Sequence, residues 1–230
     1  MPGANSTRRA NEESSSSRGG CLPTREQELL LRASLLSGDE CRGAFAAWKS
    51  LASLDHVDPG SYRLFPLLYK NLLSNGVDDP YLNIFKWVYD TTRENNGKRF
   101  AALARLLAKL RERGMEFVLL KGAALVAGYY RDYGLRPMLD ADLLVPTRRA
   151  REAVEMLMEL GWSSSLTPLK GFGDLDALSR LGWKPEERKL SEYSDEYFTV
   201  RHGHDLVNPD EFTIDLHWHA LHGYNPREAD

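Results

Sequence analysis

The chain has 230 residues, of which 42% are hydrophobic and 27% charged, a composition typical of a globular protein with a sizeable core. Its formal net charge of −3 argues against a dedicated nucleic-acid binder, which would carry an excess of Lys and Arg. No apolar run reaches the ~18 residues of a membrane span, and Cys21 and Cys41 lack the spacing of a zinc or redox site. We therefore expect a cytoplasmic protein with free thiols.

The N-terminal half is predicted to be helical. Residues 1–24 are rich in Ser, Gly, Asn and Arg and have too little apolar surface to offset the entropy of ordering, so we expect a disordered tail. Residues 25–113 then show helical periodicity and are expected to pack on the core that follows. The Asn-Asn-Gly run at 95–97 predicts a kink or break in a long helix that ends at Gly114.

Residues 114–230 are predicted to form an α/β core. The apolar run at 117–120 is typical of a buried strand, and a short helix is expected from 123 to about 130. A second strand is predicted at 140–145. A helix with Thr147 as its cap should follow and end near Gly161.

The remaining elements are weaker. The basic run Arg148, Arg149 and Arg151 predicts a solvated helix face. Residues 163–192 are polar, with one helical turn expected near 175–181, and strands are predicted at 197–202 and 212–219.

Three aspartates suggest a metal site. Asp140 and Asp142 stand at positions i and i+2 of a predicted strand, so both side chains project from one face, roughly 6.6 Å apart along the backbone. Such a pair can hold two cations that clamp the oxygens of a phosphoryl transfer. Asp215 interrupts the apolar run 212–216 and is the candidate third ligand. Oxygen ligands favour Mg²⁺ or Mn²⁺. The pair alone is weak evidence, because solvated carboxylates give the same pattern.

The neighbourhood of these aspartates suits a nucleotide. The order strand, Lys-Gly, helix places the backbone N–H groups of Gly122 and Ala123 at a helix N-terminus, which binds anions such as a triphosphate. Lys121 adds a mobile positive charge, and Arg136 adds a forked donor suited to phosphate. Together these four residues are predicted to bind the phosphates of a nucleotide.

Three motifs occur in order along the chain: LLKGAAL at 119–125, LRPMxDxDLLV at 135–145 and IDLHW at 214–218. With them, the region from about 80 to 222 resembles the uncharacterised nucleotidyltransferase family of the DNA polymerase β-like superfamily. The resemblance implies an α+β fold, in which the helical N-terminal region precedes a small mixed sheet flanked by helices. It also implies transfer of a nucleoside monophosphate from a triphosphate such as ATP, with Asp140, Asp142 and Asp215 as metal ligands and catalytic residues.

Two departures from the pattern leave an alternative open. The wider superfamily has Gly-Ser where this chain has Lys121-Gly122, although the narrower family shares the Lys-Gly form. Similar proteins also continue well beyond the strand of the third aspartate, so part of the nucleotide or acceptor pocket is expected to be missing if the chain ends at Asp230. A catalytically silent module that binds a nucleotide or a protein is therefore the alternative, against which the retained aspartates argue.

A second alternative comes from the histidines, five of which cluster near the C-terminus: His202, His204, His217, His219 and His222. They could form a zinc site of a hydrolase, but their spacing matches no standard zinc signature. The simpler interpretation is that His217 supports Asp215 by hydrogen bonding. The acceptor cannot be identified from the sequence; the charge favours a small molecule or peptide over RNA, and Tyr129, Tyr130 and Tyr133 could line its pocket.

Overall fold

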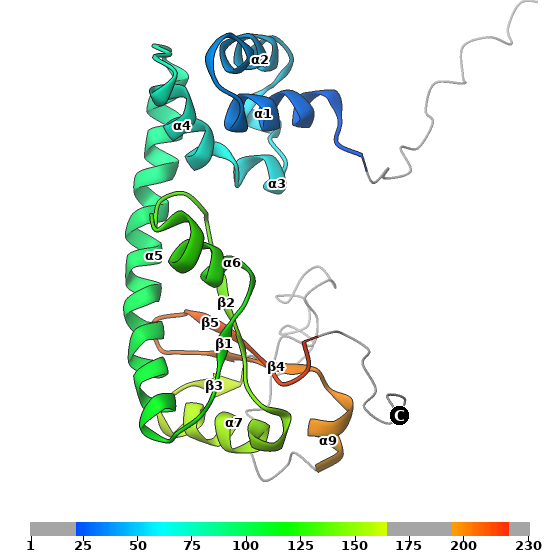
Figure 1. Ribbon diagram of the computed structural model, residues 1–230, viewed down its shortest axis with the longest axis vertical. Coiled ribbons are helices and arrows are strands. Elements are labelled where there is room, and N and C mark those ends of the chain that lie inside the picture. The colour runs from blue at the N-terminus through cyan, green and yellow to red at the C-terminus, as the bar shows by residue number, and fades with distance from the viewer. Residues whose placement is uncertain (1–21, 165–194, 221–230) are drawn as a thin grey trace, which may run out of the picture.

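The computed structural model describes residues 22–164 and 195–220, and in this part of the chain helices precede a sheet (Figure 1). Residues 1–21 of the predicted tail lie outside the described residues. The helical part contains α1 (Arg25–Leu35), α2 (Gly38–Leu51), a 3₁₀ turn (Leu54–His56), α3 (Pro59–Tyr62), α4 (Phe65–Ser74) and the long α5 (Tyr81–Glu112). Thr24 caps α1 through a capping box with Gln27, and Asp58 caps α3 through the N–H groups of Gly60 and Ser61.

An aromatic cluster holds the helical part together. Trp48 of α2 is 1% exposed, and its ring centroid lies 6.1 Å from those of Phe65 in α4 and Phe85 in α5. Phe65 and Phe85 are themselves 4.8 Å apart. Edge and tilted contacts of this kind add to the free energy gained by burying the rings. The helices α1, α2, α4 and the first part of α5 thus enclose a hydrophobic core of their own.

The helix α5 runs without interruption through the Asn-Asn-Gly run, so the predicted kink or break is wrong. The reason is tertiary. Asn96 is fully buried, and its side-chain amide donates to the carbonyl oxygens of Tyr133 and Arg136 at 2.7 and 2.8 Å instead of competing for the helix backbone. The same side chain therefore anchors the loop that leads into the second strand.

The second part of the fold is a five-stranded sheet within the described residues. Its strands are β1 (Val118–Leu119), β2 (Asp140–Leu144), β3 (Ser163–Ser164), β4 (Gly203–Val207) and β5 (Thr213–His217), in the order β1-β2-β5-β4-β3. β2 and β5 are parallel and the other pairs are antiparallel. The predicted fold class, a helical region followed by a small mixed sheet with helices, is confirmed.

The helices around the sheet only partly follow the prediction. α6 (Lys121–Ala124) continues as a π-helix (Leu125–Tyr130), close to the expected range. A 3₁₀ turn (Thr147–Arg149) leads into α7 (Ala150–Glu159), but Thr147 is not its cap, because its hydroxyl donates to the carbonyl of Trp218 at 2.8 Å. The helical turn expected near 175–181 lies outside the described residues.

The strand predicted at 197–202 is wrong. Residues Asp195–Val200 form the helix α9, and the strand β4 begins only at Gly203. In α9 the ring of Phe198 packs on Trp218, with centroids 5.2 Å apart, and Tyr197 lies 6.0 Å from the same indole. The aromatic residues that suggested a strand thus serve to dock a short helix on the end of β5.

One face of the sheet is covered by α5 and α7. Ala141, Leu143, Ile214 and Leu216 point to this side and are fully buried in the second hydrophobic core. Residues one position away on β2 and β5 point to the opposite face, because side chains alternate along a strand. The polar side chains of β2 and β5 in this register, Asp142, Asp215 and His217 among them, therefore lie on the face that α5 and α7 leave uncovered.

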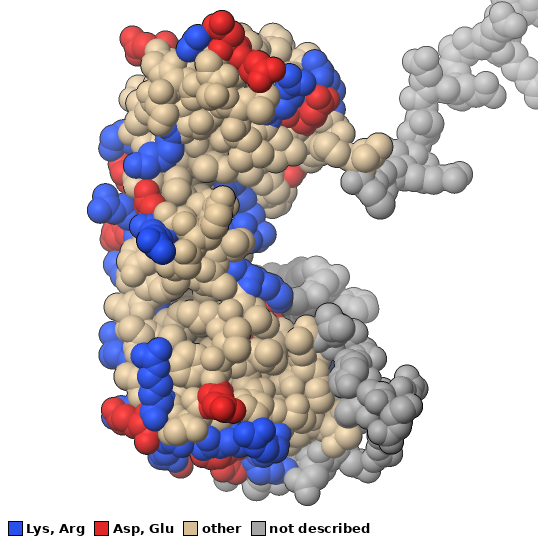
Figure 2. Space-filling view, in the orientation of Figure 1, with Lys and Arg blue, Asp and Glu red and all other residues tan. Residues whose placement is uncertain are grey.

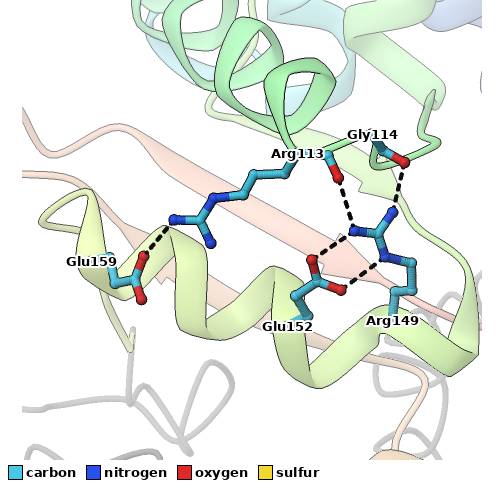
Figure 3. A network of polar contacts seen from close by, with 5 residues as sticks. All are labelled: Arg113, Gly114, Arg149, Glu152 and Glu159. Carbon is cyan, nitrogen blue, oxygen red and sulfur yellow. Dashed lines mark hydrogen bonds and ion pairs between the residues drawn. The ribbon is translucent and has the colours of Figure 1, made fainter.

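A polar network joins the end of α5 to α7 (Figure 3). The guanidinium of Arg149 donates to the carbonyl oxygens of Arg113 and Gly114 at 3.0 and 2.6 Å, and the carboxylate of Glu152 holds it at 2.6 and 2.8 Å. Arg113 also reaches Glu159 at 3.0 Å. Arg149 therefore satisfies carbonyls at a helix C-terminus and is not solvated as the sequence predicts, whereas the side chain of Arg148 is 75% exposed, as predicted.

The two parts form two lobes connected along α5, with a hollow between them on the right of Figure 2. The first core lies in the upper lobe and the second in the lower one, and α5 contributes side chains to both. In residues 22–164 and 195–220, no helix combines the length and the apolar character needed to cross a bilayer.

Candidate functional site

Three carboxylates lie side by side across the uncovered face of the sheet. The parallel register places Asp142 of β2 opposite Asp215 of β5, and the antiparallel register places Asp215 opposite Asp205 of β4. Residues directly opposite each other on neighbouring strands share a face and lie within about 5.5 Å. The strand pairing therefore concentrates three acidic groups at one place.

His217 connects two of these carboxylates. Its Nε2 lies 3.1 Å from an oxygen of Asp142 and 3.0 Å from an oxygen of Asp215. Asp142, Asp215 and His217 each offer one ligand atom, and these three atoms all lie within 4.8 Å of one another. Asp142 is only 5% exposed, so this group is set into the sheet surface. A set of two carboxylates and one imidazole at this separation could hold a divalent cation.

Lys121 supplies positive charge to the same group. Its ammonium donates to the Asp142 oxygen that also faces His217, at 2.5 Å. This hydrogen bond, followed by the charges of the nearby aspartates, raises the pKa of Lys121. Asp142 thus has the Lys121 ammonium and the His217 imidazole as partners, and these contacts offset part of the free energy of burying its charge.

The imidazole and Asp215 also shift each other's protonation. The hydrogen bond to Asp215 and then that to Asp142 raise the pKa of His217 against the effect of its burial. Burial alone would raise the pKa of Asp215, but the hydrogen bond from His217 and the charge of His217, then a hydrogen bond shared with Asp205 and the charge of Lys121, hold it below its usual range. Asp215 therefore stays ionised at neutral pH.

The backbone at Lys121 is strained. Its φ of +46° lies in the left-handed region, which costs a residue with a side chain roughly 1–3 kcal/mol. Gly122 follows, and a Cβ there would lie 3.4 Å from the Nε of Arg136 and 3.5 Å from Met138. This tight turn starts α6 directly after β1, so the first N–H groups of α6 lie at the same end as Lys121.

Arg136 and Asp140 flank this group. The Nε of Arg136 is buried and has no hydrogen-bond partner within residues 22–164 and 195–220. Asp140 begins β2 opposite Thr213, is exposed, and lies outside the close group of ligand atoms. Its charge acts on Lys121 and on Arg99 of α5. Of the predicted metal ligands, the structure thus brings Asp142 and Asp215 together. Asp140 lies on the same face, two residues before Asp142 on β2.

The histidines of the zinc alternative do not assemble into one site in the described part of the chain. His204 pairs with Leu216 and so points to the covered face, where its ring lies 2.5 Å from the Tyr197 hydroxyl and 2.8 Å from the Ser164 hydroxyl. Burial, followed by the charge of Arg201, lowers the pKa of His204 to about 4. The ring of His202 lies 5.8 Å from that of His217, centroid to centroid, and His222 lies outside the described residues.

Asp205 was not among the predicted site residues. The predicted strand in this region ends at residue 202, before β4 begins. The face of the sheet to which the side chain of Asp205 points is therefore not predicted from the sequence. A signal was nevertheless present, because Asp205 is followed by the apolar Leu206 and Val207, as expected within a strand. The contact between Lys121 and Asp142 could not be foreseen, because it joins residues on two different elements.

The comparisons with known proteins agree with this geometry. A family model described as uncharacterised nucleotidyltransferase matches residues 61–230, most of the chain. The chain belongs to this family. The matched range includes α4, α5 and the whole sheet, and with them Lys121, Asp142 and Asp215. Neither the curated proteins nor the solved structures contain a match to this nucleotidyltransferase.

Proposed function

We propose that this nucleotidyltransferase moves a nucleoside monophosphate from a nucleoside triphosphate to a hydroxyl or phosphate acceptor, with Asp140, Asp142 and Asp215 as its metal ligands. The observation that supports this most is the group of Asp142, Asp215 and His217, whose ligand atoms lie within 4.8 Å of one another beside Lys121. A cluster so acidic is costly for the fold unless cations neutralise it. The acceptor stays open, with a small molecule or peptide favoured over RNA.

The donor atoms suit magnesium or manganese, because all three aspartates offer oxygen and Asp140 is exposed and free to turn toward the group. When bound, such an ion supplies charge neutralisation at the phosphate oxygens. The chain itself would hold the phosphates through the Lys121 ammonium, the Gly122 and Ala123 N–H groups and the Arg136 guanidinium. The buried Nε of Arg136, which has no partner among the described residues, is a donor that an anion could satisfy.

Asp215 is proposed to accept the proton of the attacking hydroxyl. Its lowered pKa keeps it ionised and able to accept, and His217 holds the carboxylate in place at 3.0 Å. The rate gain would come mostly from positioning and charge stabilisation rather than from covalent chemistry.

Nucleotide binding is the first test. The melting temperature of the wild type and of the Asp140→Asn/Asp142→Asn double variant is measured with each of the four nucleoside triphosphates, with and without magnesium. A ligand that binds the folded state raises the melting temperature by mass action. We expect a magnesium-dependent rise in the wild type that disappears in the double variant. Asp90→Asn, an exposed carboxylate of α5 paired with Lys86, is the matched control and should keep the rise.

An equal rise in the wild type and the double variant would indicate a catalytically silent nucleotide-binding module. The absence of any rise in the wild type would contradict the proposed function, and partner proteins or zinc would then be tested.

Transfer itself is predicted to depend on Asp142. Asp142→Asn keeps the size of the side chain but removes the charge that faces Lys121 and His217. We expect the rate of pyrophosphate release, measured with the nucleotide that raises the melting temperature and an extract that contains the acceptor, to fall by about 10³-fold or more. The far-UV circular dichroism should be unchanged. Full activity in Asp142→Asn would rule out the mechanism.

A further inference from the structure

A cleft lies where α4, α5, the π-helix and the segment after it meet. It is open to solvent and has a volume of about 650 Å³, within the range of small-molecule sites, roughly 300–1,000 Å³. Three of its lining side chains are cationic, Lys70, Arg93 and Arg131, and one is a carboxylate, Asp132. We call this site the basic cleft. None of its residues belongs to the candidate metal group.

The carboxylate of the basic cleft is already bonded. The Tyr89 hydroxyl donates to both oxygens of Asp132, at 3.1 and 2.9 Å, and the Gly134 N–H donates to one of them at 2.9 Å. Lys70 lies 3.7 Å from Asp132 and also 5.0 Å from the centre of the Tyr89 ring. Lys70 therefore neutralises the charge of Asp132, and the two arginines give the cleft a net positive charge.

The guanidinium groups of Arg93 and Arg131 form no hydrogen bond or ion pair with any residue of 22–164 or 195–220. Arg131 is held at a φ of +52°, in the left-handed region that glycine favours, and strain of this kind gathers at functional sites. With no carboxylate partner in the described part of the chain, two guanidinium groups at one cleft form a receptor for an oxyanion, since their forked N–H groups match phosphate and carboxylate.

The basic cleft is connected to the candidate site. Arg93 and Arg99 lie six residues apart on α5, about 9 Å along the helix axis, and the charge of Arg99 interacts with Asp140. The loop that runs from Arg131 to Asp140 is anchored to α5 by Asn96. Arg99 and this loop therefore link the basic cleft to the start of β2.

We propose that the basic cleft binds the acidic group, a phosphate or a carboxylate, of the small molecule that accepts the nucleotide. The role as acceptor site rests on the proposed function; the binding of an oxyanion does not. Guanidinium groups at the cleft select for negative charge, and the volume of the cleft suits a small molecule.

The test is titration calorimetry of the full chain with inorganic phosphate and, separately, with citrate, in EDTA and without nucleotide. Saturable binding is expected in the wild type, and the better probe distinguishes phosphate from carboxylate chemistry. Arg93→Gln and Arg131→Gly should each bind about tenfold more weakly, because each loses charged hydrogen bonds. Arg131→Gly also relieves the left-handed strain, so its fold should be preserved. Arg105→Gln, an exposed arginine of the same helix as Arg93, should bind like the wild type.

The proposal is overturned if the wild type binds neither anion, or if Arg93→Gln and Arg131→Gly bind as tightly as the wild type. It is also overturned if Lys121→Gln alone abolishes binding, since the anion would then occupy the candidate nucleotide site. The magnesium-dependent nucleotide shift should persist in both cleft variants. Its absence in the wild type would refute the proposed function and with it the acceptor role, while the anion titration would still decide whether the cleft binds an oxyanion.

Discussion

Asp142 illustrates how single residues in this protein serve the site at the expense of the fold. Its carboxylate is buried, and removing a charge from water costs several kcal/mol, which Lys121 and His217 offset only in part. A hydrophobic residue in the middle of β2 would suit the sheet at least as well. The strained backbone of Lys121 adds a second local cost at the same place. A buried charge and a strained backbone at two residues in contact are expected of a functional site rather than of a structural ion pair.

At the same scale, His204 is predicted to make stability depend on pH. Burial holds its folded-state pKa at about 4, whereas the unfolded chain has the ordinary value of 6.5. Between these values the unfolded state binds more protons, so the free energy of unfolding falls as the pH falls. For this one residue the loss from pH 7.5 to pH 5 is about 2 kcal/mol.

Urea unfolding at pH 7.5 and pH 5 measures this effect. The free energy of unfolding should differ less between the two pH values in His204→Gln than in the wild type. The reduction should be about 2 kcal/mol. His56→Gln, which changes an exposed histidine, should behave like the wild type. An identical pH dependence of His204→Gln and wild type would refute the buried, neutral state of this ring.

At the scale of elements, the pairing of β4 with β5 positions the site. Gly203 lies opposite His217, and a Cβ at this position would come within 2.8 Å of the backbone oxygen of Leu216 and 3.3 Å of the His217 ring. Gly203→Ala is therefore expected to push the strands apart. We expect a loss of roughly 1–3 kcal/mol in the free energy of unfolding and a weaker magnesium-dependent nucleotide shift.

The control for this prediction is Gly43→Ala in α2, where the added methyl group meets no atom of the described residues within 4 Å. It should stabilise the protein slightly, by about 0.5–1 kcal/mol, because alanine favours a helix interior. Both variants can be compared by urea unfolding. A Gly203→Ala protein as stable as the wild type would show that β4 and β5 have room for a methyl group between them.

At the scale of the whole molecule, α5 couples the two lobes. It places Phe85 and Val88 in the first core and Leu103, Leu106 and Leu110 in the second. Because one rigid helix belongs to both cores, we expect the wild type to unfold in a single transition. Gly97 lies between the two sets and has open space around it.

Gly97→Pro should break this coupling. Proline in a helix interior costs about 3 kcal/mol or more and bends the helix, so the lobes should unfold separately. Hydrogen exchange followed across a urea series would then show two transitions, one for each lobe. Gly97→Ala, the control, should keep a single transition and raise stability by about 0.5–1 kcal/mol. A single transition in Gly97→Pro would mean that the lobes are coupled by contacts other than α5.

Where the physics is local, the sequence alone determined the structure. Gly114 and Gly161 end their helices in the left-handed conformation, at φ values of +61° and +85°, because only glycine adopts it without strain. The apolar runs around Asp142 and Asp215 likewise identify β2 and β5, since alternation along a strand depends on neighbouring residues alone. The acidic character of the candidate site is therefore predictable from the order of residues along the chain.

Only the tertiary structure decided the features that join distant segments. Asn96 leaves α5 straight because it has partners in a loop some forty residues later, and the segment at Asp195–Val200 is a helix because its aromatic rings dock on Trp218. The register of β4 against β5 alone places Asp205 beside Asp215 and points His204 to the opposite face. Register and docking depend on the free energy of burying side chains contributed by several elements at once, and no local pattern contains that information.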